Sequence, residues 1–241
     1  MKSTLKYISS FFLLFSILGW SQTTDSLPKF KDRYGLRVGI DLHRLTRSLY
    51  DKDYQGIEFT GDFRLSKRYF AAAEIGTEKR DTREPQINAT TRGQYLKIGF
   101  DYNTHQNWLQ LENMVNVGLR YGFSTFSQTL NSYKIYNPNP YFGNGDFIDV
   151  NREYSGLTAH WIETVAGIKV QVFTNVFVGF SFRLNIMIQE KDPSGFENLY
   201  IPGYNRTYND RFGVGFNYTV SYFLPLYKKD KGVSAEKKKK K

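Results

Sequence analysis

Charged side chains recur at alternate positions within apolar stretches of this 241-residue chain. In the run Val176–Ile188, for example, Arg183 stands between Phe182 and Leu184. A period of two is that of a β-strand, which has one apolar face and one polar face. The charged residues that fall on polar faces are Arg37, Asp41, Glu58, Asp62, Arg64, Glu74, Glu78, Lys97, Asp101, Arg120, Glu163, Lys169 and Arg183. Charges gathered on one surface can neutralise one another as ion pairs or form a pathway for protons or ions, and we expect ion pairs.

The three histidines are the other side chains that could do chemistry near neutral pH. His43 is expected to face inward near the top of the first strand, His105 lies in a turn, and His160 begins the sixth strand. None belongs to a Ser-His motif, no spacing of His, Asp and Glu fits a metal site, and no Gly-rich phosphate loop follows a strand. We therefore expect no enzyme, no metal and no cofactor.

Eight strands are needed to position these charges. They span about residues 34–45, 55–65, 69–79, 92–102, 109–126, 160–173, 176–188 and 211–224. Ordinary strands have about 5 to 6 residues, whereas strands that cross an outer membrane need about 9 to 11. The segments 127–155 and 190–209 are rich in Pro, Gly and Asn, and we expect them to be loops.

The pattern predicts an all-β fold, an eight-stranded antiparallel up-and-down transmembrane β-barrel. The second, fourth and sixth connections are the short ones, and outer-membrane barrels have short periplasmic turns, so both termini should be periplasmic. The alternative is a soluble lipocalin-like barrel with its apolar face inside, since parity does not reveal which face is inside. Strand length and aromatic residues near strand ends favour the membrane. Those aromatic residues are Tyr34, Tyr54, Tyr69, Tyr102, Phe123, Trp161, Phe173, Phe212 and Tyr222.

The chain divides into a leader, a barrel and a tail. Residues 1–21 are interpreted as a signal peptide, with Lys2 and Lys6 before an apolar stretch and small residues before Gln22. Residues 22–33 form a periplasmic lead-in, 34–227 the barrel, and 228–241 a lysine-rich disordered periplasmic tail. No cysteine is present, which excludes disulfides and a lipid-modified N-terminal cysteine.

The formal charge of +10 is concentrated at the ends of the chain. Residues 228–241 hold eight lysines against two acids, and Lys2 and Lys6 lie in the leader, which leaves about +2 elsewhere. Nucleic-acid-binding proteins cluster their basic residues on one folded face. Here acids and bases are interspersed, so no nucleic acid is expected as a partner.

The last strand carries a pattern known from one class of proteins. Arg211, Gly213, Phe216 and Tyr218 follow the order polar, Gly, apolar, apolar, as in strands presented to the barrel assembly (BAM) machinery. The chain thus resembles small eight-stranded outer-membrane barrels such as the OmpA membrane domain. The leader ending in Trp-Ser-Gln, the Asn- and Tyr-rich loops and the lysine tail are similar to Bacteroidota envelope proteins, including a family of unknown function whose barrels accompany that machinery. The resemblance implies an integral location in a Gram-negative cell outer membrane, with outer-membrane lipids, lipopolysaccharide and other outer-membrane proteins as partners.

Two function classes follow from these observations. Eight strands enclose only enough space for side chains, so we expect a barrel plugged by its own ion pairs, acting as a non-enzymatic structural or accessory subunit of an outer-membrane protein complex. The alternative is a lipid-modifying enzyme or a small-ligand-binding barrel. Small outward residues allow another protein to approach closely. The expected partner contacts are Gly61, Ala71 and Ala73 and the tail lysines Lys237, Lys238, Lys239, Lys240 and Lys241.

Overall fold

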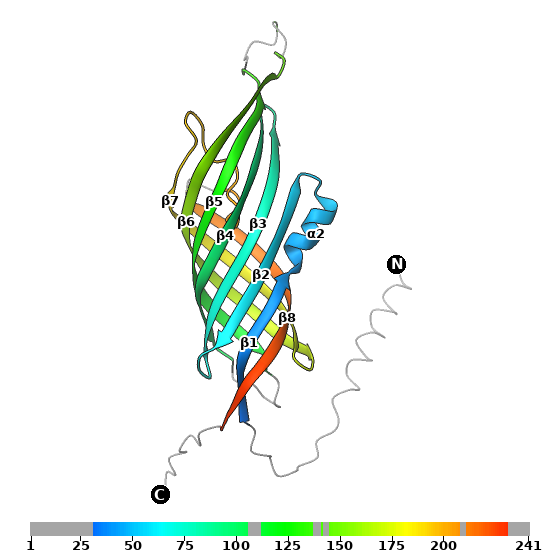
Figure 1. Cartoon of the computed structure of the whole chain (residues 1–241), viewed down its shortest axis with the longest axis vertical. Coiled ribbons are helices and arrows are strands. Elements are labelled where there is room, and N and C mark those ends of the chain that lie inside the picture. The colour runs from blue at the N-terminus through cyan, green and yellow to red at the C-terminus, as the bar shows by residue number, and fades with distance from the viewer. Residues whose placement is uncertain (1–30, 106–111, 137–140, 142–144, 208–210, 231–241) are drawn as a thin grey trace, which may run out of the picture. The chain divides into compact units, whose positions relative to one another are not determined.

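The computed structural model describes residues 31–105, 112–136, 141, 145–207 and 211–230 (Figure 1). The predicted signal peptide, most of the lead-in and the five tail lysines lie outside these residues. The elements are β1 (Lys31–Asp41), α2 (Leu42–Tyr50), β2 (Tyr54–Arg64), β3 (Tyr69–Glu84), β4 (Ile87–Asn103), β5 (Met114–Tyr133), β6 (Ile148–Phe173), β7 (Val176–Glu190) and β8 (Phe212–Asp230). Within the described residues, no helix has both the length and the apolar character needed to cross a membrane.

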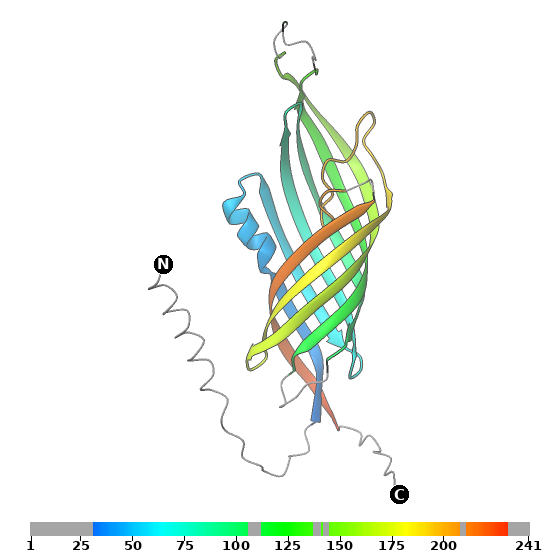
Figure 2. The same cartoon turned by 180° about the vertical axis from the view of Figure 1, so that it is seen from behind.

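The strands form one closed barrel in sequence order, and β8 returns to pair with β1 (Figures 1 and 2). Every pairing is antiparallel. The predicted all-β, eight-stranded, up-and-down fold is therefore confirmed. Because the number of strands is even, β1 begins and β8 ends at the same end of the barrel. We call this the terminus end and the opposite one the loop end.

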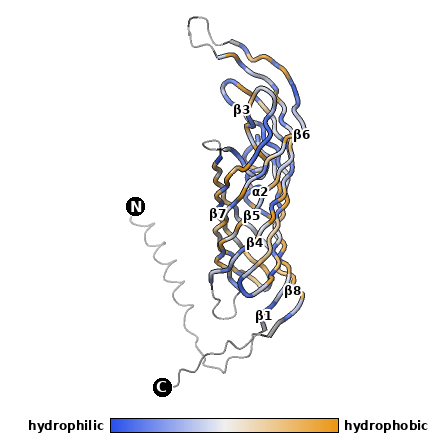
Figure 3. The backbone as a smooth tube through the Cα atoms, turned by 90° about the vertical axis from the view of Figure 1, so that its left-hand side faces the viewer, coloured by the Kyte–Doolittle hydropathy of each residue, from blue (hydrophilic) through white to orange (hydrophobic). Residues whose placement is uncertain are grey.

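Hydropathy alternates along the strands (Figure 3). The polar residues of this alternation are mostly buried in the barrel, whereas the large apolar residues are mostly exposed on its outside. In β7, Leu184 is 49% exposed and its neighbour Arg183 is 5% exposed. The same contrast holds between Ile98 and Lys97 in β4. Successive side chains of a strand point to opposite faces, so this is the predicted parity. The lipocalin-like alternative, with the apolar face inside, is wrong.

Several strands are longer than predicted. The segment 127–155 is not one irregular loop, because β5 continues to Tyr133 and β6 begins at Ile148. Only two residues separate β3 from β4. In Figure 1, β3 to β6 extend past α2, β7 and β8 at the loop end, where Ile87 of β4 is opposite Tyr133 of β5. Polar residues join these strands because each backbone group finds a partner on the neighbouring strand, which the local sequence does not reveal.

Both barrel boundaries also lie further out than predicted. β1 starts at Lys31 instead of residue 34, and β8 ends at Asp230 instead of residue 227. The reason is mutual pairing, since Lys31 is opposite Asp230 in the β1–β8 ladder. The first three residues of the predicted tail are thus part of a strand.

The first strand does not continue to residue 45. The chain turns at Asp41 into α2, where the Asp41 carboxylate accepts a 2.8 Å hydrogen bond from the His43 backbone N–H. A side chain in this position satisfies a backbone donor that the first helical turn leaves free. The apolar alternation that predicted a strand through Leu42 also fits a helix, because Leu42, Leu45 and Leu49 have helical spacing. His43 therefore lies on a helix and not on the inner face of a strand.

Three of the aromatic residues expected outside are buried: Tyr34, Tyr54 and Trp161. Trp161 packs edge to face on Tyr204, with ring centroids 5.6 Å apart, inside a cluster of apolar side chains at the loop end. That cluster consists of Tyr95, Phe126, Leu157, Ala159, Trp161, Met187, Ile201 and Tyr204. Trp161 is two residues from Glu163, so strand parity places both side chains on the inner face. The position of Trp161 near the end of its strand led to the wrong prediction that it belongs to an aromatic belt at the membrane surface. Tyr69, Phe173, Phe212 and Tyr222 are exposed.

Candidate functional site

The candidate site is the charged interior of the barrel. Most of the predicted inward charges are buried: Arg37, Asp41, Glu58, Asp62, Glu74, Glu78, Lys97, Asp101, Arg120, Glu163 and Arg183. Arg64 and Lys169 are only partly buried, with side chains 15% and 22% exposed. The charges come from β1 to β7, so only barrel closure brings them together.

The centre of the lumen is organised around Glu74 and Glu163. The Arg183 guanidinium lies 2.5 Å from a Glu74 oxygen and 2.7 Å from Glu163. Lys97 Nζ lies 3.2 Å from Glu163 and 3.6 Å from Glu74. It is also 3.8 Å from Glu58, which links the centre to the loop end. Buried carboxylates shared among cations in this way are neutralised where water cannot solvate them.

A second group of ion pairs lies toward the terminus end. Arg120 is 2.7 Å from Asp101, and Lys169 Nζ is 2.6 Å from Asp62. Arg37 approaches Asp62 at 3.6 Å, and its guanidinium lies 4.3 Å from the centroid of the Phe177 ring. The face of the Phe177 ring therefore adds to the stabilisation that Asp62 gives the Arg37 cation.

Arg64 belongs to the rim of the terminus end and not to the central network. Its guanidinium is 3.8 Å from Asp32 and 5.0 Å from the centroid of the Tyr34 ring. Nearby, Arg33 donates two hydrogen bonds to the Glu112 carboxylate. These pairs line a cavity of about 380 Å³ at this end of the barrel.

At the loop end, the network includes a cation that the sequence analysis missed. Arg44 of α2 is buried; its guanidinium lies 3.0 Å from Glu58 and also pairs with Glu78. Tyr95 donates a 2.6 Å hydrogen bond to Glu58, and Tyr54 donates one of 2.8 Å to Glu78. The predicted inward charges comprise seven carboxylates and six cations. This excess of one carboxylate could have indicated that a further cation was supplied from elsewhere.

The β7–β8 connection covers the loop end. The Tyr200 hydroxyl donates to Glu78 at 2.7 Å, and the Gly203 backbone N–H donates to the same carboxylate at 2.9 Å. Burial raises the pKa of Tyr204 to about 12, with a contribution from Glu190. These tyrosines are therefore neutral at physiological pH and act as hydrogen-bond donors.

The three histidines do not come together in this arrangement. His43 packs on Phe216, His160 bonds to the Tyr121 hydroxyl at 2.7 Å, and His105 lies in the β4–β5 connection, so the histidines are on separate elements. Among the described residues, no group of His, Asp and Glu could hold a metal ion. The buried charges of the interior are paired with one another instead.

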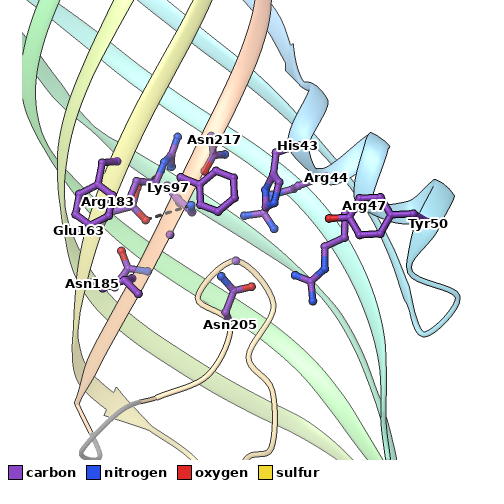
Figure 4. Close-up of a pocket in the computed structure, with 15 residues that line it drawn as sticks. His43, Arg44, Arg47, Tyr50, Lys97, Glu163, Arg183, Asn185, Asn205 and Asn217 are labelled. Carbon is purple, nitrogen blue, oxygen red and sulfur yellow. Dashed lines mark hydrogen bonds and ion pairs between the residues drawn. The ribbon is translucent and has the colours of Figure 1, made fainter. Parts of the chain in front are cut away.

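The barrel wall is incomplete beside α2. β1 pairs with β8 only up to Asp41–Thr219 and with β2 only up to Ile40–Phe59. Beyond these points α2 lies between β8 and β2, and Figure 4 shows His43, Arg44 and Arg47 extending from it toward the interior. A cavity of about 390 Å³ opens there, lined by α2, the start of β8, Asn205 and the central ion pairs.

The predicted small patch lies on the outside of β2 and β3. Gly61 is opposite Ala73 in the ladder, and Ala71 is opposite Phe63. Ala73 is exposed, whereas Gly61 and Ala71 are half-buried. The structure thus places the three residues together on the outer face, while the tail lysines lie outside the described residues.

Comparisons with known proteins complete the description. A search of curated proteins gave no match. One similar solved structure is the crystal structure of Ail, the attachment invasion locus protein of Yersinia pestis, at 8% identity and a TM-score of 0.39, covering 80% of this chain and 99% of Ail. A family model matches residues 4–229. The chain therefore belongs to the family described as Domain of unknown function (DUF6048).

Proposed function

We propose that this protein is an integral outer-membrane β-barrel that conducts no ions and serves as a non-enzymatic structural or accessory subunit of an outer-membrane protein complex. The observation that carries the proposal is the polarity of the barrel, with apolar side chains outside and paired charges inside. A soluble barrel would lose free energy by exposing such a surface to water, whereas a bilayer favours it.

We infer that the ion pairs interrupt any aqueous path through the lumen. Ion pairs occupy the centre, aromatic side chains and Arg33 lie at the terminus end, and the β7–β8 connection covers the loop end. Single-channel recording of the purified protein in planar bilayers should therefore show no steady large openings. Such openings would contradict the plug.

The proposed orientation has both termini in the periplasm. The connections at the terminus end are residues 65–68, 104–113 and 174–175. Those at the loop end include the two longest, 134–147 and 191–211, although the third connection, predicted to be long, is the two-residue turn 85–86. Short turns on the periplasmic side are typical of outer-membrane barrels. The absence of cysteine permits a direct test, since a membrane-impermeant maleimide should label Ser194→Cys but not Lys67→Cys in intact cells. The reverse pattern would invert the proposed orientation.

A subunit role is supported by a patch of small residues on the outer face of the barrel. The Gly61–Ala71–Ala73 patch on the outer face allows a neighbouring protein to approach closely. The barrel assembly machinery is the candidate complex, on the resemblance of the last strand. Gentle detergent extraction and identification of co-purifying proteins would name the partners.

The patch and the tail have distinct tests. Ala71→Leu with Ala73→Leu should leave the barrel folded and reduce co-purification, whereas the control Val115→Leu with Val117→Leu on β5 should have no effect. Deleting residues 231–241 should make the remaining association less sensitive to salt. Equal recovery of partners with the double Leu variant would show that the patch is only lipid surface. Lipid A mass spectra with and without the gene would reveal a lipid-modifying enzyme instead.

A further inference from the structure

The interrupted wall beside α2 connects the outside of the barrel with its interior. The cavity there is lined both by outward apolar side chains, Phe182, Val214 and Phe216, and by the inward charges Lys97 and Arg183. Where the strand ladder of a barrel is intact, its backbone separates outward side chains from inward ones. The mixture therefore arises where β1 has ended and α2 stands beside β8.

Parts of this cavity are open and polar. A Cβ atom added at Gly215, on the inner face of β8, would meet no atom within 4 Å. Arg183 Nε and Asn185 Oδ1 are buried and have no hydrogen-bond partner among the described residues. Buried polar atoms without partners are costly, so a ligand with hydroxyl or similar groups would be stabilised here.

A second cavity of about 420 Å³ adjoins the first and shares Arg47, Asn205 and Val214 with it. In Figure 4, Arg47 extends from α2 toward the loop that carries Asn205. The other arginines that line the second cavity are Arg80, Arg83 and Arg206. It lies at the loop end, next to the apolar outer face of β8.

The arginines of the second cavity exceed their carboxylate partners. Asp51 is shared by Arg47 and Arg80. Arg83 pairs with Asp53 at 3.0 Å, and Arg206 pairs with Glu84. Four guanidinium groups thus face three carboxylates, which leaves a positive balance. Guanidinium groups bind phosphate with two parallel hydrogen bonds, and they do so more specifically than lysine.

From these features we propose that the two cavities bind the headgroup of a phosphorylated glycolipid. This inference rests on the proposed membrane location of the barrel. The phosphate lies among Arg47, Arg80, Arg83 and Arg206, and sugar hydroxyls enter the cavity beside Gly215. The acyl chains remain in the bilayer against Phe182, Val214 and Phe216. The phosphate, sugar and acyl parts of such a lipid match the cationic, polar and apolar side chains that line the two cavities in the same order.

The test uses the purified full-length protein in detergent, with bound lipid counted by native mass spectrometry. The probes are lipid A with both phosphates and the same lipid A after removal of its phosphates. Wild type should retain the phosphorylated probe. Arg80→Gln with Arg206→Gln should weaken retention about tenfold or more, as expected for loss of charge-assisted hydrogen bonds. The control Arg68→Gln with Arg92→Gln removes two exposed arginines elsewhere and should retain the lipid.

A second variant tests the inner cavity. Gly215→Leu fills the open space beside β8 and should reduce retention while heat-modifiable migration on gels shows that the barrel still forms. Equal retention of dephosphorylated lipid A, or equal weakening in the Arg68/Arg92 control, would overturn the proposal. So would inorganic phosphate binding as tightly as lipid A, since the occupant would then be phosphate without lipid.

The assay separates this inference from the proposed function, because it needs no partner complex. Failure to retain lipid A by a correctly folded, non-conducting barrel would remove the glycolipid site and leave the subunit role in place. Steady channel openings or loss of heat-modifiable migration would count against the proposed function itself.

Discussion

The barrel wall is built in two different ways. From β2 through β7 to β8, each strand is hydrogen-bonded to neighbours over most of its length, and charged side chains meet behind it. Between β8 and β2, the loop-end half of the wall is a nine-residue helix whose side chains make the contacts. There Ser48 Oγ accepts a 2.9 Å hydrogen bond from the Gly56 N–H, and Thr46 bonds to the Tyr218 hydroxyl.

This difference shows what a helix can and cannot replace in a closed sheet. A strand satisfies the backbone groups along the whole edge of its neighbour, and an apolar environment makes every unsatisfied group costly. A helix uses its backbone groups internally, so it offers the neighbouring edges only side chains. It covers the gap but leaves space, which is why a cavity of about 390 Å³ opens toward the interior here.

The strongest way to break the regular half is to remove one cation from the lumen. Arg183→Leu leaves Glu74 and Glu163 without their nearest partner, and breaking a buried ion pair costs about 3–5 kcal/mol. The free energy of unfolding, measured by urea titration in lipid vesicles, should fall by that amount. Arg68→Leu, at an exposed turn, should leave it nearly unchanged. An Arg183→Leu variant as stable as wild type would show that the network contributes no net stability.

The outside of the same strand gives the next largest effect. Leu184→Arg places a charge near the middle of β7 on the apolar face and should cost about 2–4 kcal/mol in a bilayer. Ile188→Arg, near the end of β7, should cost about 0–1 kcal/mol. Equal effects at the two depths in vesicle unfolding would argue against a membrane-spanning β7.

The helical part of the wall should respond more weakly. Ser48→Ala removes the acceptor for the Gly56 N–H and should cost about 1 kcal/mol. Hydrogen exchange at the Gly56 amide should also become faster, a local readout that an effect on the whole barrel would not produce alone. Ser194→Ala, at an exposed position of the β7–β8 connection, serves as the control. Unchanged exchange would mean that α2 does not protect the β2 edge.

The end of α2 should show the smallest effect, and it depends on pH. Although burial acts in the opposite direction, the hydrogen bond from Arg80 holds the pKa of Asp51 below its usual value. Because the pKa of Asp51 is lower in the folded state than the unfolded-state value of about 3.9, its ionised carboxylate stabilises the fold at pH values above about 3.9. This stabilisation is lost as the pH falls through the folded-state pKa. Asp51→Asn should therefore cost under about 1 kcal/mol at pH 7. The difference from wild type in urea unfolding should shrink below about pH 4, and a constant difference would assign it to another cause.

The sequence predicted the regular half of the wall far better than the helical half. Around Leu184 the alternation is unbroken, so both the strand and the buried position of Arg183 follow from a local period. At Asp41 the same alternation led to a wrong strand, because Leu42, Leu45 and Leu49 also suit a helix. Asp41 as a helix-capping residue was the available signal, and Arg44 three residues later was its ion-pair partner at 3.5 Å.

The extended hairpin of β5 and β6 illustrates a second limit. Residues such as Asn131 and Ser132 have weak strand preference, yet Ser132 is paired with Asp149 in the ladder and Asn131 donates a 2.9 Å hydrogen bond to Thr90. Strand preference reflects the neighbours that a residue meets as much as the residue itself. The strand ends could therefore not be read from the local sequence.

By itself, the sequence determined which side chains share a face of each strand and that the chain would form eight antiparallel strands, because strand parity is a property of consecutive residues. The tertiary structure alone decided which inward charges meet, where the strands end and how α2 closes the wall. Glu74 and Arg183 are 109 residues apart and come together only across the closed lumen. Such contacts depend on barrel closure and register, which no stretch of neighbouring residues encodes.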